Sequence, residues 1–307
     1  MNVVVFSGGV GGARFVQGVA RALAPEAVTV VGNVGDDLEV LGLHVSPDLD
    51  SIMYALAGVN DEERGWGRAG ETWRVLESVA ELGGETWFRL GDLDLGVHLV
   101  RTQALRAGTP LSAATAGLCA ALGVEPCLLP ATDDAVRTWI ATAEGELSFQ
   151  EWFVARGHRD EVDGVRFAGA GSAAPAPGVL DAIATADLLL LAPSNPYVSI
   201  APILAVRAIR DALTARAVPC VAVSPLIAGR AVKGPADRML ARLAGGTRPA
   251  HVAACYEGLI DALVVDEADA SDLDGLGEVR PIIARTLMVD LDARRRLAEA
   301  ALGAVPA

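Results

Sequence analysis

The sequence is poor in the residues that build disulfide frameworks, zinc sites and nucleic-acid-binding surfaces. It has four cysteines and four histidines in 307 residues, and no two cysteines stand in a Cys-x-x-Cys pair. A disulfide scaffold or a structural zinc site is therefore not expected, and a reducing compartment suits such thiols. Acidic residues outnumber basic ones by 39 to 25, giving a formal net charge of −14. This balance argues against a nucleic-acid partner, because phosphate backbones are bound by basic surfaces.

Long apolar runs and targeting features are also missing. No run reaches the roughly eighteen apolar residues of a membrane span. The N-terminus begins directly with an apolar run at 3–6 and lacks the basic stretch of a signal peptide. We therefore expect a cytoplasmic protein that does not insert into a membrane. The 52% hydrophobic content is enough for one large α/β domain or two modest ones.

The N-terminal segment has the pattern of an α/β sheet domain. A predicted strand at 2–6, a helix at 12–24 and a second strand at 27–32 form the unit that starts a doubly wound sheet. Further apolar runs predict buried strands at 188–192, 220–224 and 263–266. The fold class that follows is α/β, with a Rossmann-like, doubly wound and mostly parallel sheet.

The middle of the chain differs from both ends. All five tryptophans lie there. The pattern predicts helices at 51–58, 70–82, 112–122 and 133–143, with short strands at 97–102 and 146–150. We interpret 51–165 as an inserted, mainly helical subdomain, and 1–50 with 166–307 as a Rossmann-like nucleotide-binding domain. A site is expected in the cleft between them.

Glycines follow the first predicted strand directly. Gly9, Gly11 and Gly12 stand where backbone N–H groups and a helix N-terminus can bind a phosphate. The turn is neither a complete GxGxxG, because Arg14 replaces the third glycine, nor a Walker A loop. We predict a nucleotide or diphosphate site here, with Arg14 as a candidate phosphate ligand. A turn that only lets the helix pack closely would show the same pattern.

Acidic residues crowd the same stretch. Asp36 and Asp37 follow the second predicted strand, and Asp48 and Asp50 precede the next predicted helix. Carboxylates repel a nearby phosphate unless a divalent cation lies between them. We therefore predict a Mg²⁺ site held by Asp50 and Asp37. Two other interpretations stay open: an NAD-type oxidoreductase, whose ribose-binding acid occupies this position, and plain helix caps or turns.

A polar turn follows the strand predicted at 188–192. It consists of Ser194, Asn195 and Pro196. Ligands of open parallel sheets bind at the carboxyl ends of the strands, so this turn lies at the edge where a ligand would bind. We predict that these three residues contact the nucleotide or its diphosphate.

Several segments occur together in the order of one known family. They are Phe6-Ser7-Gly8-Gly9 with Gly11, Ser46-Pro47-Asp48-Leu49-Asp50, Leu90-Gly91-Asp92, Ser194-Asn195-Pro196 and Ser224-Pro225-Leu226-Ile227. With these motifs, from residue 3 to about 290, the chain resembles the CofD/FbiA family. Members are the phospholactate or phosphoenolpyruvate transferases of coenzyme F420 biosynthesis.

The resemblance implies a Mg²⁺-dependent transferase. The family moves a phospholactate or phosphoenolpyruvate group from a guanosine diphosphate-activated donor (LPPG or EPPG) to the ribityl hydroxyl of Fo. Fo is 7,8-didemethyl-8-hydroxy-5-deazariboflavin, and the products are coenzyme F420-0, or its dehydro form, and GMP. A lactyl, enolpyruvyl or glyceryl donor is equally compatible with these motifs. A related branch, which binds nucleotide sugars as a regulator, is the homologous alternative.

The resemblance also implies roles for residues. Asp50 and Arg89 would contact Fo, and Asp50 would also be catalytic, while the aromatic-rich insertion would form much of the deazaflavin pocket. The family often has lysine where this chain has Arg89, and threonine where it has Val10. The glycine turn would therefore bind through backbone N–H groups alone. A homodimer is expected, with no nucleic-acid or membrane partner.

Overall fold

The computed structural model describes residues 1–304 and centres on a seven-stranded sheet. In chain order the strands are β1 (Val3–Ser7), β2 (Val28–Gly32), β5 (Cys127–Pro130), β9 (Leu188–Leu191), β10 (Cys220–Val223), β13 (Ala262–Asp266) and β14 (Arg280–Ala284). They lie in the order β14-β13-β10-β9-β1-β2-β5, and every neighbouring pair is parallel. The predicted Rossmann-like α/β sheet is confirmed, and it is parallel throughout rather than mostly parallel.

The direction of sheet growth reverses at β1. The chain first builds outward through β2 to β5, then returns to the other side of β1 and adds β9, β10, β13 and β14. The carboxyl ends of β1 and β9 therefore form a topological switch point, where open α/β sheets bind ligands. The predicted glycine turn follows β1 and Ser194 follows β9, so the fold puts both at this point.

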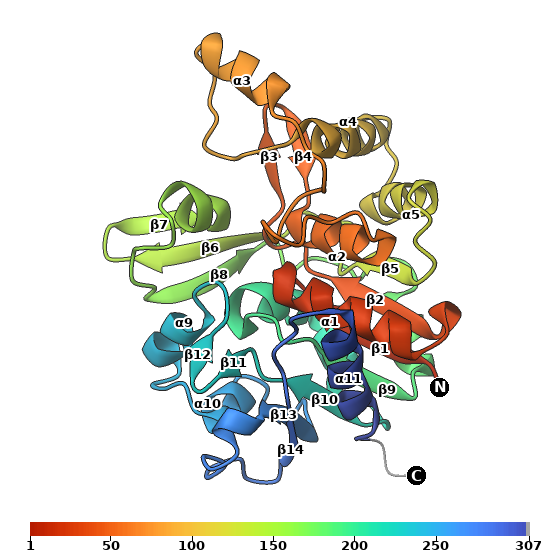
Figure 1. Cartoon of the computed structure of the whole chain (residues 1–307), viewed down its shortest axis with the longest axis vertical. Helices are drawn as coiled ribbons and strands as arrows, with labels where there is room; N and C mark the ends of the chain where they lie inside the picture. The colour runs from red at the N-terminus through yellow and green to blue at the C-terminus, as the bar shows by residue number, and fades with distance from the viewer. Residues whose placement is uncertain (305–307) are drawn as a thin grey trace.

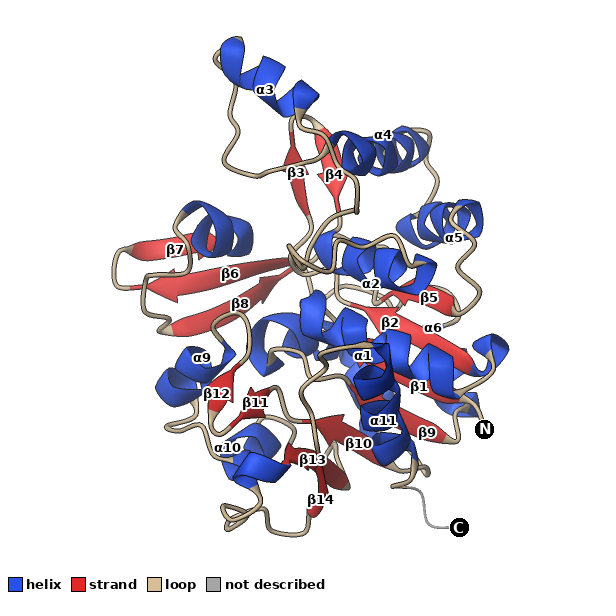
Figure 2. Cartoon of the chain, in the orientation of Figure 1, coloured by secondary structure: helices blue, strands red, loops and turns tan. Residues whose placement is uncertain are grey.

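Helices cover both faces of the sheet (Figure 2). One layer consists of α1 (Gly9–Ala22), α2 (Pro47–Ala57), α5 (Leu111–Ala121) and α11 (Leu291–Leu302). The other consists of α6 (Val179–Thr185), α7 (Ala201–Leu204), α8 (Arg207–Thr214), α9 (Ala236–Leu243) and α10 (Pro249–Ala254). Along β1, Val3 and Val5 pack into the first layer, and Val4 and Phe6 into the second. Strands buried on both faces read as continuous apolar runs, which is why the sequence predicted them.

The last helix of the chain crosses the first at close range (Figure 1). An added Cβ at Gly18 of α1 would overlap the backbone carbonyl of Arg294 in α11. The Arg294 side chain is buried and donates hydrogen bonds to the carboxylate of Glu62 and to Gln17. The crossing therefore ties the C-terminal helix to the segment that follows α2.

The predicted insertion at 51–165 is not one separate body. Its strand β5 pairs with β2 at the edge of the central sheet, and α2 and α5 pack in the helical layer over that sheet. Two parts project from the sheet domain (Figure 1). The first, which we call the upper unit, contains β3 (Leu38–Val40), β4 (Leu43–Val45), α3 (Arg74–Glu81) and α4 (Asp92–Arg106). The second is an antiparallel sheet of β6 (Arg137–Thr142), β7 (Gly145–Ser148) and β8 (Gly164–Ala168).

Two predicted elements have the wrong type. The helix predicted at 133–143 is mostly the strand β6, where Thr138 and Ile140 are buried at a spacing of two residues. The strand predicted at 97–102 lies inside the helix α4, whose buried residues follow helical spacing. Both stretches are short and mixed in polarity, so a local pattern did not separate the two periods.

The remaining elements are short. They are the hairpin β11 (Leu226–Ile227) and β12 (Arg230–Ala231), the 3₁₀ turns η1 (Pro25–Ala27) and η4 (Glu267–Asp269), and the π-helical turns η2 (Glu151–Ala155) and η3 (Pro196–Ile200). Within residues 1–304, no helix combines the length and apolar character that crossing a bilayer requires.

Candidate functional site at the switch point

Ser194 joins the two loops of the switch point. Its hydroxyl donates a hydrogen bond to the carbonyl of Gly8 at 2.7 Å and accepts one from the Gly8 N–H at 3.3 Å. An added Cβ at Gly12 would overlap this hydroxyl, so α1 can begin this close to the β9 loop only with glycine there. The structure thus brings the predicted glycine turn and Ser194 together. It also shows that part of the glycine requirement comes from packing.

Asn33 is the centre of the site, although it is not among the site residues predicted from the sequence. It is fully buried at the end of β2, and its side-chain amide donates to Asp48 at 2.9 Å, to Asp36 at 3.2 Å and to the carbonyl of Val198 at 3.2 Å. The side-chain oxygen Oδ1 of Asn33 accepts a hydrogen bond from the Gly35 N–H at 2.7 Å. One side chain therefore contacts the loop after β2, the first turn of α2 and the turn η3. The signal available in the sequence was a polar residue directly after a buried strand.

The carboxylates around Asn33 are not neutralised by an arginine or lysine ion pair within the described residues, although the charge of Arg137 partly opposes the rise in the pKa of Asp36. Burial, together with the charges of Asp48 and Asp37, raises the pKa of Asp36 well above its usual value. Burial also raises the pKa of Asp48 to about 6, although hydrogen bonds from Asn33 and the Gly9 backbone oppose the rise. Within the described residues, no arginine or lysine forms an ion pair with Asp36, Asp37 or Asp48. A cation placed here would relieve this repulsion.

Asp37 is held from one side only. One of its oxygens accepts from Ser46 at 2.9 Å and lies 3.0 Å from the His44 ring. The other oxygen is buried and has no partner in the part of the chain that the structure describes. A buried acceptor without a partner is costly, and it is a natural contact for a bound cation or its water. Asp37 therefore stays a candidate metal ligand.

No complete metal site is formed by side chains alone. Across residues 1–304, no three His, Cys, Asp or Glu side chains are arranged to hold an ion by themselves. Mg²⁺ does not need such a cage, because it commonly binds one or two carboxylates, substrate phosphates and water. The donor set of Asp36, Asp37 and Asp48 fits that mode of binding.

Asp50 pairs with Arg101, a contact that was not predicted from the sequence. Both of its oxygens accept hydrogen bonds from the guanidinium of Arg101, one of them at 3.0 Å. Arg101 comes from α4 and is fully buried, and Asp50 itself is 4% exposed. The Asp50 carboxylate is therefore already neutralised. Its predicted metal-binding role has less support here than the same role for Asp36 and Asp48.

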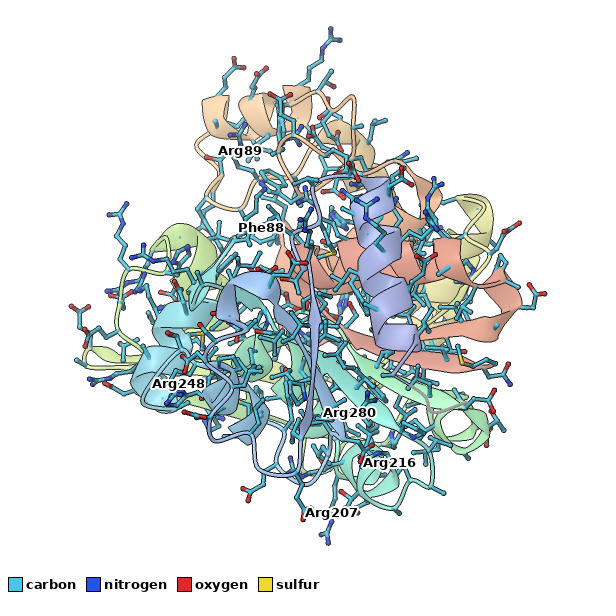
Figure 3. All side chains as sticks on the ribbon, turned by 60° about the horizontal axis from the view of Figure 1, so that its bottom comes forward. Phe88, Arg89, Arg207, Arg216, Arg248 and Arg280 are labelled. Atoms are coloured by element: carbon cyan, nitrogen blue, oxygen red, sulfur yellow. The ribbon has the colours of Figure 1, made fainter. Side chains whose placement is uncertain are left out.

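Arg89 lies in the upper unit, on the loop before α4 (Figure 3). Its guanidinium stands over the ring of Trp73 at 4.5 Å, rather than beside its neighbours Trp87 and Phe88. Arg64 packs against the same ring at 5.0 Å. Arg89 is exposed and, among residues 1–304, forms no ion pair, so its charge is available to a ligand.

Three other predicted residues point elsewhere. The Arg14 guanidinium donates to the backbone carbonyl of Glu62 at 3.3 Å, which directs it away from the glycine turn. The Asn195 side chain accepts from the Tyr197 N–H at 2.9 Å and donates to the sulfur of Met239 at 3.3 Å. Pro196 is the first residue of the turn η3. Of the predicted Ser-Asn-Pro turn, Ser194 alone hydrogen-bonds to the glycine turn.

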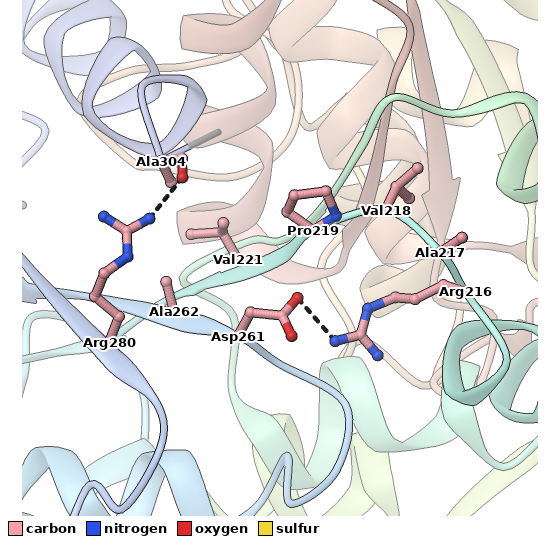
Figure 4. Close-up of a pocket in the computed structure, with 9 residues that line it drawn as sticks. All are labelled: Arg216, Ala217, Val218, Pro219, Val221, Asp261, Ala262, Arg280 and Ala304. Carbon is pink, nitrogen blue, oxygen red and sulfur yellow. Dashed lines mark hydrogen bonds and ion pairs between the residues drawn. The ribbon is translucent and has the colours of Figure 1, made fainter. Parts of the chain in front are cut away.

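Two cavities lie away from this site. One, of about 550 Å³, is lined by Arg216, Asp261 and Arg280 among others (Figure 4). It is at the amino ends of β10, β13 and β14, the opposite edge of the sheet. The other, of about 380 Å³, lies beside α7 and α8. Neither includes a carboxylate of the switch point, so topology and charge, rather than cavity size, identify the site.

Comparisons with known proteins agree on one family. The family described as 2-phospho-L-lactate transferase CofD matches residues 3–301. A phosphoenolpyruvate transferase of Streptomyces griseus is 44% identical over 98% of both chains. One from Streptomyces coelicolor is 45% identical over 98% of this chain and 97% of its own, and one from Thermobifida fusca is 46% identical over 91% of both. A UPF0052 protein of Bacillus halodurans shares the fold, with a TM-score of 0.66 at 19% identity over 98% of both chains.

Proposed function

The chain belongs to the CofD family of 2-phospho-L-lactate transferases, and we propose that it transfers a phosphoenolpyruvate group from a guanosine diphosphate-activated donor to the ribityl hydroxyl of Fo. At the coarser level it is a CofD-type transferase of coenzyme F420 biosynthesis. GMP is the expected second product. The observation that carries the finer proposal is the convergence of the glycine turn with three buried carboxylates at the switch point.

The relatives support an enolpyruvyl donor. Those from Streptomyces griseus, Streptomyces coelicolor and Thermobifida fusca are all named phosphoenolpyruvate transferases. Lactyl and enolpyruvyl groups differ by only a few atoms, so the motifs of the chain do not distinguish them. We therefore take the donor from the similarity, and a direct comparison of donors is part of the test.

The site residues suit binding of a guanosine diphosphate unit. Helix α1 begins at the switch point without a side-chain cap from its N-cap residue Gly8. Its first turn and its dipole attract phosphate oxygens, although the Gly9 backbone already binds Asp48. Asp36, Asp48 and Asp37 would hold Mg²⁺ against the same oxygens. When bound, this ion would neutralise negative charge on the diphosphate and on the departing GMP.

The reaction needs positioning more than covalent help from the protein. The acceptor hydroxyl oxygen bonds to the phosphorus next to the acid unit and gives up its proton to water, the bond from that phosphorus to the bridging oxygen breaks, and GMP leaves with the bridging oxygen. In our proposal Asp50 accepts a hydrogen bond from the acceptor hydroxyl and orients it. Arg89, with the aromatic side chains around it, binds the deazaflavin side of Fo. Such alignment accounts for much of the rate in phosphoryl transfer.

The decisive experiment supplies Fo, Mg²⁺ and each guanylated donor in turn and identifies the product by mass. We expect dehydro-F420-0 and GMP from the enolpyruvyl donor, and no product in excess chelator until Mg²⁺ is restored. Full activity in chelator would remove the metal from the proposal. Calorimetry with GDP and NAD separates the oxidoreductase alternative, which predicts tight binding of NAD alone. Binding of a nucleotide sugar without turnover would favour the regulatory branch.

A matched pair of variants tests the acidic cluster. Asp36→Asn keeps the side-chain shape but removes a buried charge, so we expect an intact fold with at least about a hundredfold lower activity. It should also weaken the effect of Mg²⁺ on GDP affinity, which calorimetry measures without turnover. Asp211→Asn is the control, because Asp211 is exposed on α8 in the opposite layer. Equal behaviour of the two variants would dissociate Asp36 from metal binding.

A further inference from the structure

Asp50 belongs to a buried network of polar side chains that lies between two helices. From α2 come Asp50 and, one turn later, Tyr54; from α4 come Arg101, His98 and Asp94. Each of these residues is at most 7% exposed. Hydrogen bonds connect Asp50 to Arg101 and Arg101 to His98, and the Tyr54 hydroxyl donates to Asp94. His98 and Asp94 lie within ion-pair distance of each other, with no hydrogen bond between them.

The hydrogen bonds define which side chains donate and which accept in this network. Arg101 can only donate, so the His98 Nδ1 that lies 3.3 Å from its guanidinium must accept. The other ring nitrogen of His98, Nε2, lies 3.5 Å from an oxygen of Asp94. A fully buried arginine is costly to desolvate, and its bidentate pairing with Asp50 offsets that cost.

One end of the same network lies beside the loop that carries Arg89. Asp94 lies in the first turn of α4, and the segment that carries Arg89 leads directly into that turn. The N–H groups of Leu93 and Asp94 are held by the carboxylate of Glu71 at 2.7 and 2.8 Å. Contacts of Asp50 with Arg101 therefore reach α4, the helix that the backbone of the Arg89 loop enters.

We infer that Arg101 is a positioning residue for the acceptor, because it fixes the Asp50 carboxylate and, through His98 and Asp94, holds the start of α4 and the Arg89 loop against α2. This inference rests on the proposed function only in naming the acceptor as a deazaflavin. Arg101 itself touches neither substrate. Its effect is to keep two acceptor-binding groups in one fixed relation.

Arg101→Lys is the informative variant. Lysine keeps the charge, and so most of the stability, but it loses the planar fork that holds both oxygens of Asp50. We expect deazaflavin binding, followed by its own fluorescence, to weaken about tenfold, with the KM for the guanylated donor changed less than about twofold. Arg106→Lys is the control, because Arg106 is exposed at the end of the same helix and, among residues 1–304, its side chain hydrogen-bonds only to the carbonyl of Gly42. Tyr54→Phe, at the Asp94 end of the network, should weaken deazaflavin binding less than Arg101→Lys.

Hydrogen exchange supplies a readout that needs no substrate. In Arg101→Lys we expect faster exchange of the backbone N–H groups at 87–95, with exchange in β1 and β9 unchanged. Unchanged exchange at 87–95 would overturn the inference whatever the protein binds. Equal weakening of deazaflavin and donor binding would also overturn it, because a merely structural clamp acts on both. If wild-type protein binds no deazaflavin, the proposed function fails, and the exchange result still decides whether Arg101 positions the loop.

Discussion

Replacing Gly8 by alanine should damage the site through a single methyl group. Gly8 has an extended backbone, with φ −157° and ψ 162°, which any residue can adopt, so backbone strain is not the cause. The added Cβ would instead overlap a carboxylate oxygen of Asp48 and would come within 3.0 Å of the Ser199 Cβ and 3.1 Å of the Asn33 Cβ. The carboxylate is the only one of these groups at the end of a side chain, so it is the group that must move.

The magnitude follows from what Asp48 loses. Its hydrogen bond from Asn33 is 2.9 Å long, and such bonds to a charged group contribute about 1.5–3 kcal/mol. Overpacking adds a cost of about 1–3 kcal/mol, and the stiffer unfolded chain returns about 0.4–1 kcal/mol. We expect the free energy of unfolding to fall by about 2–5 kcal/mol, since Asp48 gains some hydration when it moves. Activity should fall about a hundredfold, the usual effect of misplacing a site group by an ångström.

Urea unfolding and steady-state turnover check this prediction together. Gly117→Ala makes the same chemical change on the exposed face of α5, where nothing lies within 4 Å of the added Cβ. It should stabilise the protein by roughly 0.5–1 kcal/mol, because alanine favours a helix interior over glycine. If Gly8→Ala were as stable and as active as Gly117→Ala, the approach of Asp48 to the glycine turn would have no functional meaning.

Further predictions follow from the same contacts. Because the folded protein binds the Asp48 proton more tightly than the unfolded chain, the free energy of unfolding should decrease as pH rises from 3.8 through about 6, and Asp48→Asn should flatten this slope in urea titrations. Glu62 is the opposite case: its hydrogen bond from Arg294 lowers its pKa from 4.5 to about 2, so its stabilisation is present above pH 4.5 and is lost as pH falls through about 2. Glu62→Gln should remove that acid dependence, and an unchanged acid limb in the variant would contradict the pairing. Gly18→Ala should lower the free energy of unfolding by about 1–3 kcal/mol by forcing α1 and α11 apart, with GDP affinity retained, and an unchanged melting temperature would refute the close crossing.

The sequence determined the sheet and the position of its functional edge. The strands β1, β2, β9, β10 and β13 are almost entirely buried on both faces, so each appears as an apolar run, with Thr29 the interruption in β2. Such a run can be recognised without knowledge of the neighbouring strands. The glycines after β1 and the polar turn after β9 follow at once, because parallel strands share one carboxyl edge. Local pattern was sufficient wherever burial was symmetric.

The tertiary structure alone decided which polar groups meet. Asn33 contacts Val198 across 165 residues of chain, and Arg101 binds Asp50 across 51 residues. No local period encodes such pairs, because each depends on where distant helices and loops pack. For the same reason β5 joined the central sheet and the acidic cluster formed around Asn33, while Asp50 turned to an arginine that its own surroundings in sequence did not indicate. Spacing identified the acids, and packing determined which of them remain without a cation.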